Sequence, residues 1–259
     1  CSFCIAFRQC VTSFSLSCLS NSVFSTSDFL KSSLSGANGQ AAIREYLVYR
    51  MFNQLTELSY LVRPLTITYV DTEKNGRENT RFGFLIESKE RFGERTGWPE
   101  YEIGSISAAT LEPGYSNLVG VFQYFAGNTD YSMIGSPDEN DCCHNTQLYG
   151  DESQAIAVPY DFDQSGLVDA AYASPNPRLE LRSNRDRLHR GRCSHVDHLD
   201  ETLALFRAER DALYALIDNE AELTDASRKG MQRFLKRFFN TLDKPKAIER
   251  ELAKTCVAP

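Results

Sequence analysis

Three features that would place the protein in a broad class are missing from the sequence. None of its apolar stretches approaches the roughly 20 residues that cross a bilayer, so we predict no transmembrane segment. Basic residues are not in excess, since 28 Lys and Arg stand against 35 Asp and Glu. A nucleic-acid partner is therefore not expected, because such proteins concentrate Lys and Arg on one face. No internal repeat is apparent. The 259 residues are enough for one large domain or two small lobes around a core.

The N-terminal segment lacks an initial methionine and has no acidic residue before Asp28. Residues 1–35 are rich in serine and hold four of the eight cysteines. One interpretation is a remnant of a secretory signal that ends near residues 20–27. The other is a truncated or mistranslated start of a longer protein. We favour the second, because a basic stretch followed by an uninterrupted apolar one is missing. Under both, we expect residues 1–40 to be poorly ordered or atypical.

Four cysteines lie outside that segment: Cys142, Cys143, Cys193 and Cys256. Two disulfides in an exported protein and four buried thiols in a cytosolic one both fit this number. We favour an exported or cell-envelope location over the cytoplasm. A third alternative is a zinc site, built from Cys143, His144, Cys193 and His195. It is disfavoured because the Cys-Cys-His run lacks the two-to-four-residue spacing of structural zinc ligands.

Arginines gather in one stretch of the chain: Arg178, Arg182, Arg185, Arg187, Arg190 and Arg192. Glu180 and Asp186 alternate with them, so we favour a solvated, ion-paired segment. A patch that faces phosphate is the alternative. Three histidines in and after this stretch are expected at the surface: His189, His195 and His198.

Apolar spacing predicts an α+β fold. A helix over residues 41–58 is indicated by apolar side chains at four-residue intervals, and Glu45 lies early in it. Two β-rich runs, at residues 62–70 and 81–87, are joined through Asn75-Gly76. They predict an antiparallel hairpin, with Glu87 closing its second strand.

The remaining chain is expected to be mainly helical. Residues 88–112 read as a charged surface connection, and residues 117–125 as a buried helix. A short apolar run at residues 155–160 suits a buried strand. Apolar residues then mark one helix over residues 199–217 and another over residues 231–238. We expect these two helices to form a layer that covers the active region.

Oxygen-bearing side chains end several of these elements. Asp130 follows the predicted buried helix, Asn145 ends the next loop, and Asp161 and Asp163 follow the short strand. Carboxylate and amide oxygens are the ligands that Mg²⁺ prefers. A separate carboxylate can accept a proton from an attacking hydroxyl. The order of these residues therefore predicts a phosphotransferase. Asp163 is either a second metal ligand or an N-cap for the segment that starts at Gln164.

These residues carry a resemblance to a known family. The motifs that carry it are Arg44-Glu-Tyr-Leu-Val-Tyr-Arg50, Phe84-Leu-Ile-Glu87, Gly127-Asn-Thr-Asp130, His144-Asn145 and Tyr160-Asp-Phe-Asp163. They occur in the order seen in the CotH-like atypical protein kinases of spore coats. The Asn-x-Asp, Asn and Tyr-Asp succession is also similar to HipA-type kinases. The likeness covers roughly residues 41 to 195, and the order of its short motifs carries more weight than any one of them.

The resemblance implies a role for each site residue. Asp130 would orient or deprotonate the acceptor hydroxyl, and Asn145 and Asp161 would bind the metal. Glu45 would pair with an ATP-binding lysine, for which Lys31 is the candidate. Glu87 would lie at the hinge near the adenine or ribose.

The same resemblance implies a two-lobed, kinase-like fold. Residues 41–100 would form part of an N-lobe with a small antiparallel sheet, and residues 101–259 a mainly helical C-lobe with the catalytic site. The cofactors would be ATP with Mg²⁺ or Mn²⁺, and the acceptor a hydroxyl, such as that of a protein Ser or Thr.

The chain departs from the family pattern near its start. Gly36-Ala-Asn-Gly39 is a lone polar turn rather than a glycine-rich loop, and Lys31 is the only lysine before Glu45. We therefore expect an incomplete N-lobe. A pseudokinase or a coat-type interaction protein is one alternative function. A metal-dependent phosphohydrolase, in which clustered acids activate water, is another.

Overall fold

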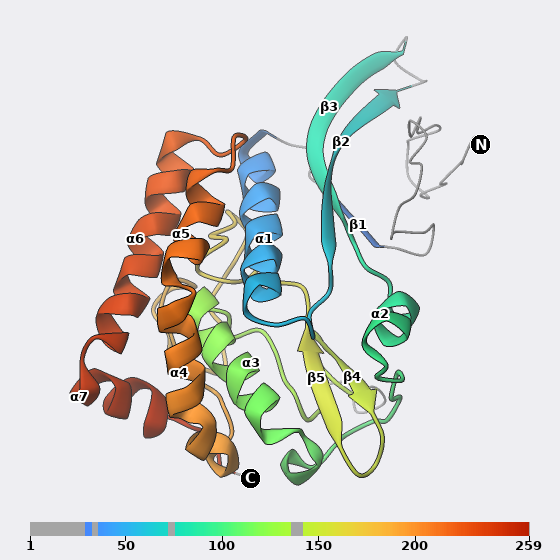
Figure 1. Ribbon diagram of the computed structural model, residues 1–259. Coiled ribbons are helices and arrows are strands. Elements are labelled where there is room, and N and C mark those ends of the chain that lie inside the picture. The colour runs from blue at the N-terminus through green and yellow to red at the C-terminus, as the bar shows by residue number, and fades with distance from the viewer. Residues whose placement is uncertain (1–28, 33–35, 72–75, 136–141, 259) are drawn as a thin grey trace.

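The computed structural model describes residues 29–32, 36–71, 76–135 and 142–258 (Figure 1). Within these ranges the fold is α+β, with two small antiparallel sheets and helices that make up most of the remainder. No helix in the described ranges is long and apolar enough to cross a membrane. The expectation for the N-terminal segment falls mostly outside these residues.

The helices and strands have the following bounds along the chain: β1 (Phe29–Ser32), α1 (Gly36–Leu55), β2 (Val62–Asp71), β3 (Arg77–Ile86), α2 (Lys89–Thr96), the 3-10 helix η1 (Ala108–Thr110), α3 (Pro113–Ala126), β4 (Thr146–Gly150), β5 (Ala155–Pro159), the 3-10 helix η2 (Cys193–His198), α4 (Leu199–Ala208), α5 (Arg210–Asp218), α6 (Asp225–Leu242), α7 (Pro245–Ile248) and the short helix η3 (Glu249–Ala253).

The predicted hairpin is confirmed as β2 and β3. The two strands pair antiparallel from Val62 opposite Ile86 to Asp71 opposite Arg77. Alternating β-branched residues explain this pairing, because they pack well on a pleated surface. Strand β1 pairs with the other edge of β3, so the strand order is β1-β3-β2. In that pairing Lys31 is opposite Phe84.

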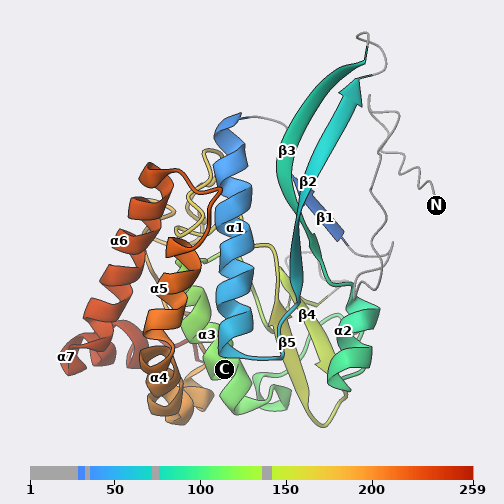
Figure 2. The same cartoon turned by 45° about the horizontal axis from the view of Figure 1, so that its top comes forward.

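Helix α1 lies between the sheet and the C-terminal helices (Figures 1 and 2). Its Tyr46 and Tyr49 rings pack on Phe84 of β3, with ring centres 5.8 Å and 5.7 Å apart. Other elements cover the opposite side, so residues 45–49 are all buried. The helix begins at Gly36 rather than at residue 41, the start that apolar spacing predicts.

Helix α3 occupies the centre of the molecule. Of its 14 residues, 12 are buried. Pro113 in its first turn and the Glu112 carboxylate, which accepts from backbone N–H groups there, fix where it begins. Gly127 ends it in a left-handed conformation, with φ of 66°. A Cβ at this position would lie 2.7 Å from the ring of Phe234, so only glycine fits this turn.

Two predicted segments differ from the structure. The charged connection over residues 88–112 contains the short helix α2, which the Ser88 side chain caps at its start and Gly97 closes. The single helix expected over residues 199–217 is two, α4 and α5, divided at Glu209. Helices this short are marginal on their own, so packing against neighbouring elements supplies most of their stability.

Candidate functional site

The turn that carries Asp130 follows directly from the end of α3. Asn128 is fully buried, and its side-chain oxygen accepts a hydrogen bond from the backbone N–H of Asp130 at 3.0 Å. The N–H of Asn128 donates to the carbonyl of Gln123 within α3, at 2.8 Å. The buried helix therefore fixes the backbone of Asp130.

His144 and Asn145 both contact the Asp130 carboxylate. Nε2 of His144 lies 2.8 Å from Oδ1 of Asp130. Nδ2 of Asn145 donates to the Asp130 backbone carbonyl at 2.8 Å and to Oδ2 at 3.2 Å. Asn145 has φ of 52°, in the left-handed region that asparagine tolerates better than most residues. The predicted base and the predicted amide ligand are thus in direct contact.

Asp161 lies next to this pair because β4 and β5 pair antiparallel. Thr146 is opposite Pro159, and the N–H of Tyr160 donates to the carbonyl of Asn145 at 3.0 Å. The N–H of Asp161 donates to the Tyr49 hydroxyl at 2.8 Å. Asp161 also has a left-handed backbone, with φ of 59°. Unfavourable backbone conformations of this kind gather at functional sites.

Tyr49 joins the acidic segment to α1. It is one turn after Glu45, whose side chain is also buried. Burial raises the pKa of Tyr49 well above its ordinary value, and the nearby charge of Glu45 raises it further. The Tyr49 ring packs edge-on against Phe162, with centres 4.8 Å apart. Glu45, Tyr49 and Asp161 therefore form one neighbourhood.

The other predicted site residues have different surroundings. Glu87 is buried, and Nε and Nη2 of Arg95 each donate to one of its carboxylate oxygens at 2.8 Å. A nucleotide contact through this side chain would have to displace that ion pair. Residues 163–168 form turns and bends rather than a helix, so there is no helix at Gln164 for Asp163 to cap. Lys31 lies on β1, the strand that pairs with β3.

A cleft of about 280 Å³ opens beside Asp130 and His144. The segment after the acidic residues forms its other side, and its full lining is Thr129, Asp130, His144, Gln164, Ser174, Pro175, Asn176, Pro177, Arg178 and Asn184. Most of these side chains are polar. The cleft therefore gives access to the Asp130 carboxylate past mostly polar residues.

The arginine-rich segment is largely structural. Arg182 pairs with Asp186, and Arg185 pairs with Asp169, as the ion-paired interpretation predicts. Arg187 instead lies with its guanidinium 3.8 Å from the ring centre of Phe234. The expectation of surface histidines is wrong for His189 and His195, which are 2% and 3% exposed. Each makes a hydrogen bond in the interior, to Leu252 and Ser116 respectively, which sequence spacing alone does not reveal.

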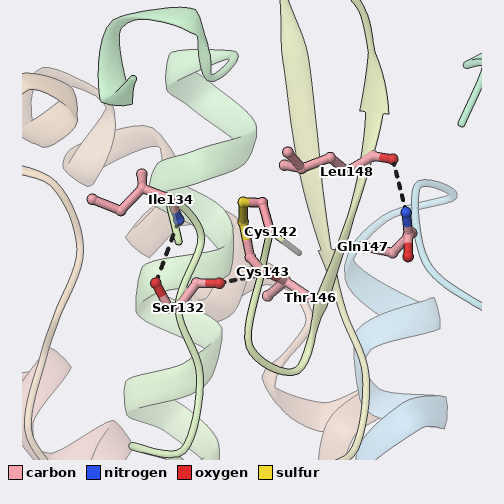
Figure 3. The surroundings of a disulfide bond; sticks show 7 residues. All are labelled: Ser132, Ile134, Cys142, Cys143, Thr146, Gln147 and Leu148. Atoms are coloured by element: carbon pink, nitrogen blue, oxygen red, sulfur yellow. Dashed lines mark hydrogen bonds between the residues drawn. A yellow bond between two sulfur atoms is a disulfide. The ribbon is translucent and has the colours of Figure 1, made fainter. Parts of the chain in front are cut away.

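The four cysteines of the described chain form two disulfides, Cys142–Cys143 and Cys193–Cys256. The zinc alternative is therefore wrong, because its two cysteines are in different disulfides. Figure 3 shows Cys142–Cys143 beside the loop of Ser132, whose carbonyl accepts from the Thr146 hydroxyl at 2.6 Å. Since the disulfide directly precedes His144 and Asn145, it belongs to the scaffold of the site.

Asn145 and Asp161 both carry side-chain oxygens of the kind that bind divalent cations. The side-chain amide of Asn145 bonds Asp130 through its nitrogen, and its side-chain oxygen is a separate atom that could bind a cation. No group of three or more His, Cys, Asp or Glu side chains in the described ranges could hold a metal. A nucleotide-bound Mg²⁺ needs fewer, because it takes one or two carboxylates together with phosphate oxygens and water. The donor pair fits that kind of cation.

Comparison of the chain with protein-family models, with curated proteins and with solved structures finds no match in any of the three. The function therefore has to be argued from the chemistry of the site.

Proposed function

We propose that the protein is an ATP- and metal-dependent phosphotransferase with a kinase-like, two-lobed fold, which moves a phosphoryl group to a hydroxyl acceptor such as a protein Ser or Thr. The observation that carries this proposal is the hydrogen-bonded connection from Asp130 through Asn145 to the Tyr160–Asp161 segment. It joins a carboxylate that faces an open cleft to two oxygen donors suited to a nucleotide-bound cation.

The arrangement of the sheet supports the nucleotide half of the proposal. Strand β1 carries Lys31, α1 follows with Glu45, and the hairpin then returns so that β3 lies beside β1. This order agrees with the small lobe that the resemblance implies, with a lysine strand before a glutamate helix. The link from Glu45 through Tyr49 to Asp161 connects that helix to the proposed metal ligands.

In the proposed reaction, the acceptor oxygen forms a bond to the γ-phosphorus of ATP as the bond to the bridging oxygen breaks, and ADP leaves. Asp130 accepts the proton of the acceptor hydroxyl. Asn145 holds the Asp130 carboxylate in place through its amide nitrogen. Asn145 and Asp161 would hold Mg²⁺ or Mn²⁺, which when bound neutralises charge on the phosphates. No further catalytic group is required, because placement of the reactants and stabilisation of charge dominate phosphoryl transfer.

The experiment is transfer of labelled γ-phosphate from ATP with Mn²⁺ or Mg²⁺ to protein and peptide hydroxyls. Asp130→Asn should lower the transfer rate by about 10²- to 10⁴-fold, the usual contribution of a general base, and leave nucleotide affinity unchanged. Asp161→Asn should weaken metal-dependent nucleotide binding as well. Equal loss of both properties in both variants would contradict this division of roles.

The same experiment separates the alternatives. Phosphate release that needs no acceptor would indicate a phosphohydrolase. Nucleotide binding without transfer to any acceptor would indicate a pseudokinase. Absence of nucleotide binding would indicate an interaction protein.

A further inference from the structure

Arg190 contacts the backbone on both sides of Asp130. Its Nη1 donates to the carbonyl of Thr129 at 2.8 Å and to the carbonyl of Tyr131 at 3.0 Å. Its guanidinium also lies 5.3 Å from the ring centre of Tyr131, within the range of a cation–π contact. One side chain therefore holds the two carbonyls that flank the proposed base.

The backbone around Arg190 is fixed from the C-terminal end of the chain. His189 bonds through Nδ1 to the carbonyl of Leu252 at 2.8 Å. The carbonyl of Gly191 accepts from Val257 at 2.8 Å, and the N–H of Cys193 donates to Val257 at 3.0 Å. The Cys193–Cys256 disulfide closes this contact covalently across 63 residues.

Helix α3 meets the same segment from the other side. A Cβ on Gly120 would lie 2.8 Å from the Cα of Gly191, so the two backbones touch at this point. Arg187 donates to the carbonyls of Tyr124 and Phe125 near the end of α3, at 3.0 Å and 3.1 Å. The segment 187–193 thus spans from the C-terminus to the turn that follows α3.

We propose that Arg190 is a positioning residue for Asp130, and that the Cys193–Cys256 disulfide holds Arg190 in place. This inference rests on the proposed function, since it gives Asp130 the role of the base. The guanidinium is suited to the task, because its planar, rigid set of donors loses little freedom when it bonds two fixed carbonyls. Without it, the turn at residues 129–131 can move relative to the bound acceptor, and a displacement of about 1 Å costs on the order of 10²-fold in rate.

The test combines kinetics with amide hydrogen exchange on the full chain. Arg190→Gln should lower kcat by about 100-fold and leave the KM for ATP unchanged, because it misplaces the base and not the nucleotide. Amides of residues 128–132 should exchange at least about tenfold faster. Arg190→Lys should recover part of both properties, and it decides the question if the Gln variant does not fold.

Two controls separate positioning from general stability. Arg182→Gln removes the same charge from the same arginine-rich stretch, and the Arg182 side chain is 92% exposed, so this variant should change neither kcat nor the exchange rate. The double variant Cys193→Ser, Cys256→Ser should speed exchange in residues 128–132 and lower kcat in the same direction as Arg190→Gln.

Unchanged exchange in Arg190→Gln, or an equal response in Arg182→Gln, overturns the role of Arg190. Unchanged exchange in the double cysteine variant overturns the role of the disulfide. Absence of phosphotransfer by the unmodified protein would instead contradict the proposed function. The exchange measurement would then still decide whether Arg190 fixes the turn at residues 129–131.

Discussion

The central helix α3 and the β2–β3 hairpin differ in how much of their surface is buried. Helix α3 is covered on all sides, so nearly every one of its residues is buried. The hairpin buries mainly the end nearest α1, where Phe84 and Ile86 lie, and it reaches away from the helices toward its tip (Figure 1). Asp130 and its supports belong to the first region, and the strands proposed to face the nucleotide belong to the second.

This difference shows where the site gets its rigidity. Chemistry that depends on placement benefits from a base that directly follows a fully packed element. A nucleotide, in contrast, must enter and leave, and regions with few buried contacts open at lower free energy. Tyr49 is the point at which the two regions meet, since its ring packs on both Phe84 and Phe162.

The largest expected effect comes from equal truncations in the two regions. Phe125 of α3 is fully buried and packs on Phe122, Phe206 and Phe238, so Phe125→Ala should lower the free energy of unfolding by roughly 3–5 kcal/mol. Phe82 in the hairpin is only partly buried, and Phe82→Ala should cost about 1 kcal/mol. Urea denaturation measures both. Equal losses of stability in the two variants would contradict the claim that the central helix is packed more tightly than the hairpin.

A pH effect of intermediate size should come from His189. Burial lowers its pKa to about 4, so the folded protein keeps it neutral where the unfolded chain, with a pKa near 6.5, binds a proton. The contribution of neutral His189 to the free energy of unfolding is then fully present above pH 6.5. It is lost as the pH drops toward 4, which lowers the free energy of unfolding by on the order of 3 kcal/mol. Urea denaturation from pH 7 to 4.5 should show a steeper fall for the unmodified protein than for His189→Gln. Parallel curves would contradict this assignment.

A smaller effect should come from the junction of the two regions. Tyr49→Phe leaves the N–H of Asp161 without its partner, which should cost about 1–3 kcal/mol. Tyr214→Phe is the control, because the Tyr214 ring also packs against another ring, although it is only partly buried, and its hydroxyl bonds no other described residue. It should change stability by less than about 0.5 kcal/mol. If the two variants behave alike, Tyr49 does not join the regions.

Local patterns were sufficient to predict much of this structure. The hairpin follows from alternation and from the Asn75-Gly76 pair in the sequence, whose first residue lies outside the described ranges, and α3 follows from an apolar run that ends at Gly127. The proximity of Asp130, Asn145 and Asp161 could be expected because each comes directly after or before a buried element.

Long-range partners could not be predicted in the same way. From the sequence alone Arg190 is predicted to be a surface charge, because its partners Thr129 and Tyr131 are distant along the chain. From the sequence alone Glu87 is predicted only to end a strand, whereas in the fold α2 brings Arg95 close enough to form an ion pair with it. In both cases the partner is supplied by the fold, and nothing in the neighbouring sequence signals it.

Thermal unfolding with ATP and Mn²⁺ tests most directly whether Asp130, Asn145 and Asp161 share one nucleotide site. At 100 times the dissociation constant, binding adds about 2.7 kcal/mol to the free energy of unfolding, which is enough to raise the Tm by several degrees. We predict that rise for the unmodified protein and for Asp130→Asn, and its loss in Asp161→Asn. No rise in the unmodified protein at millimolar nucleotide, or the same rise in Asp161→Asn, would contradict the account.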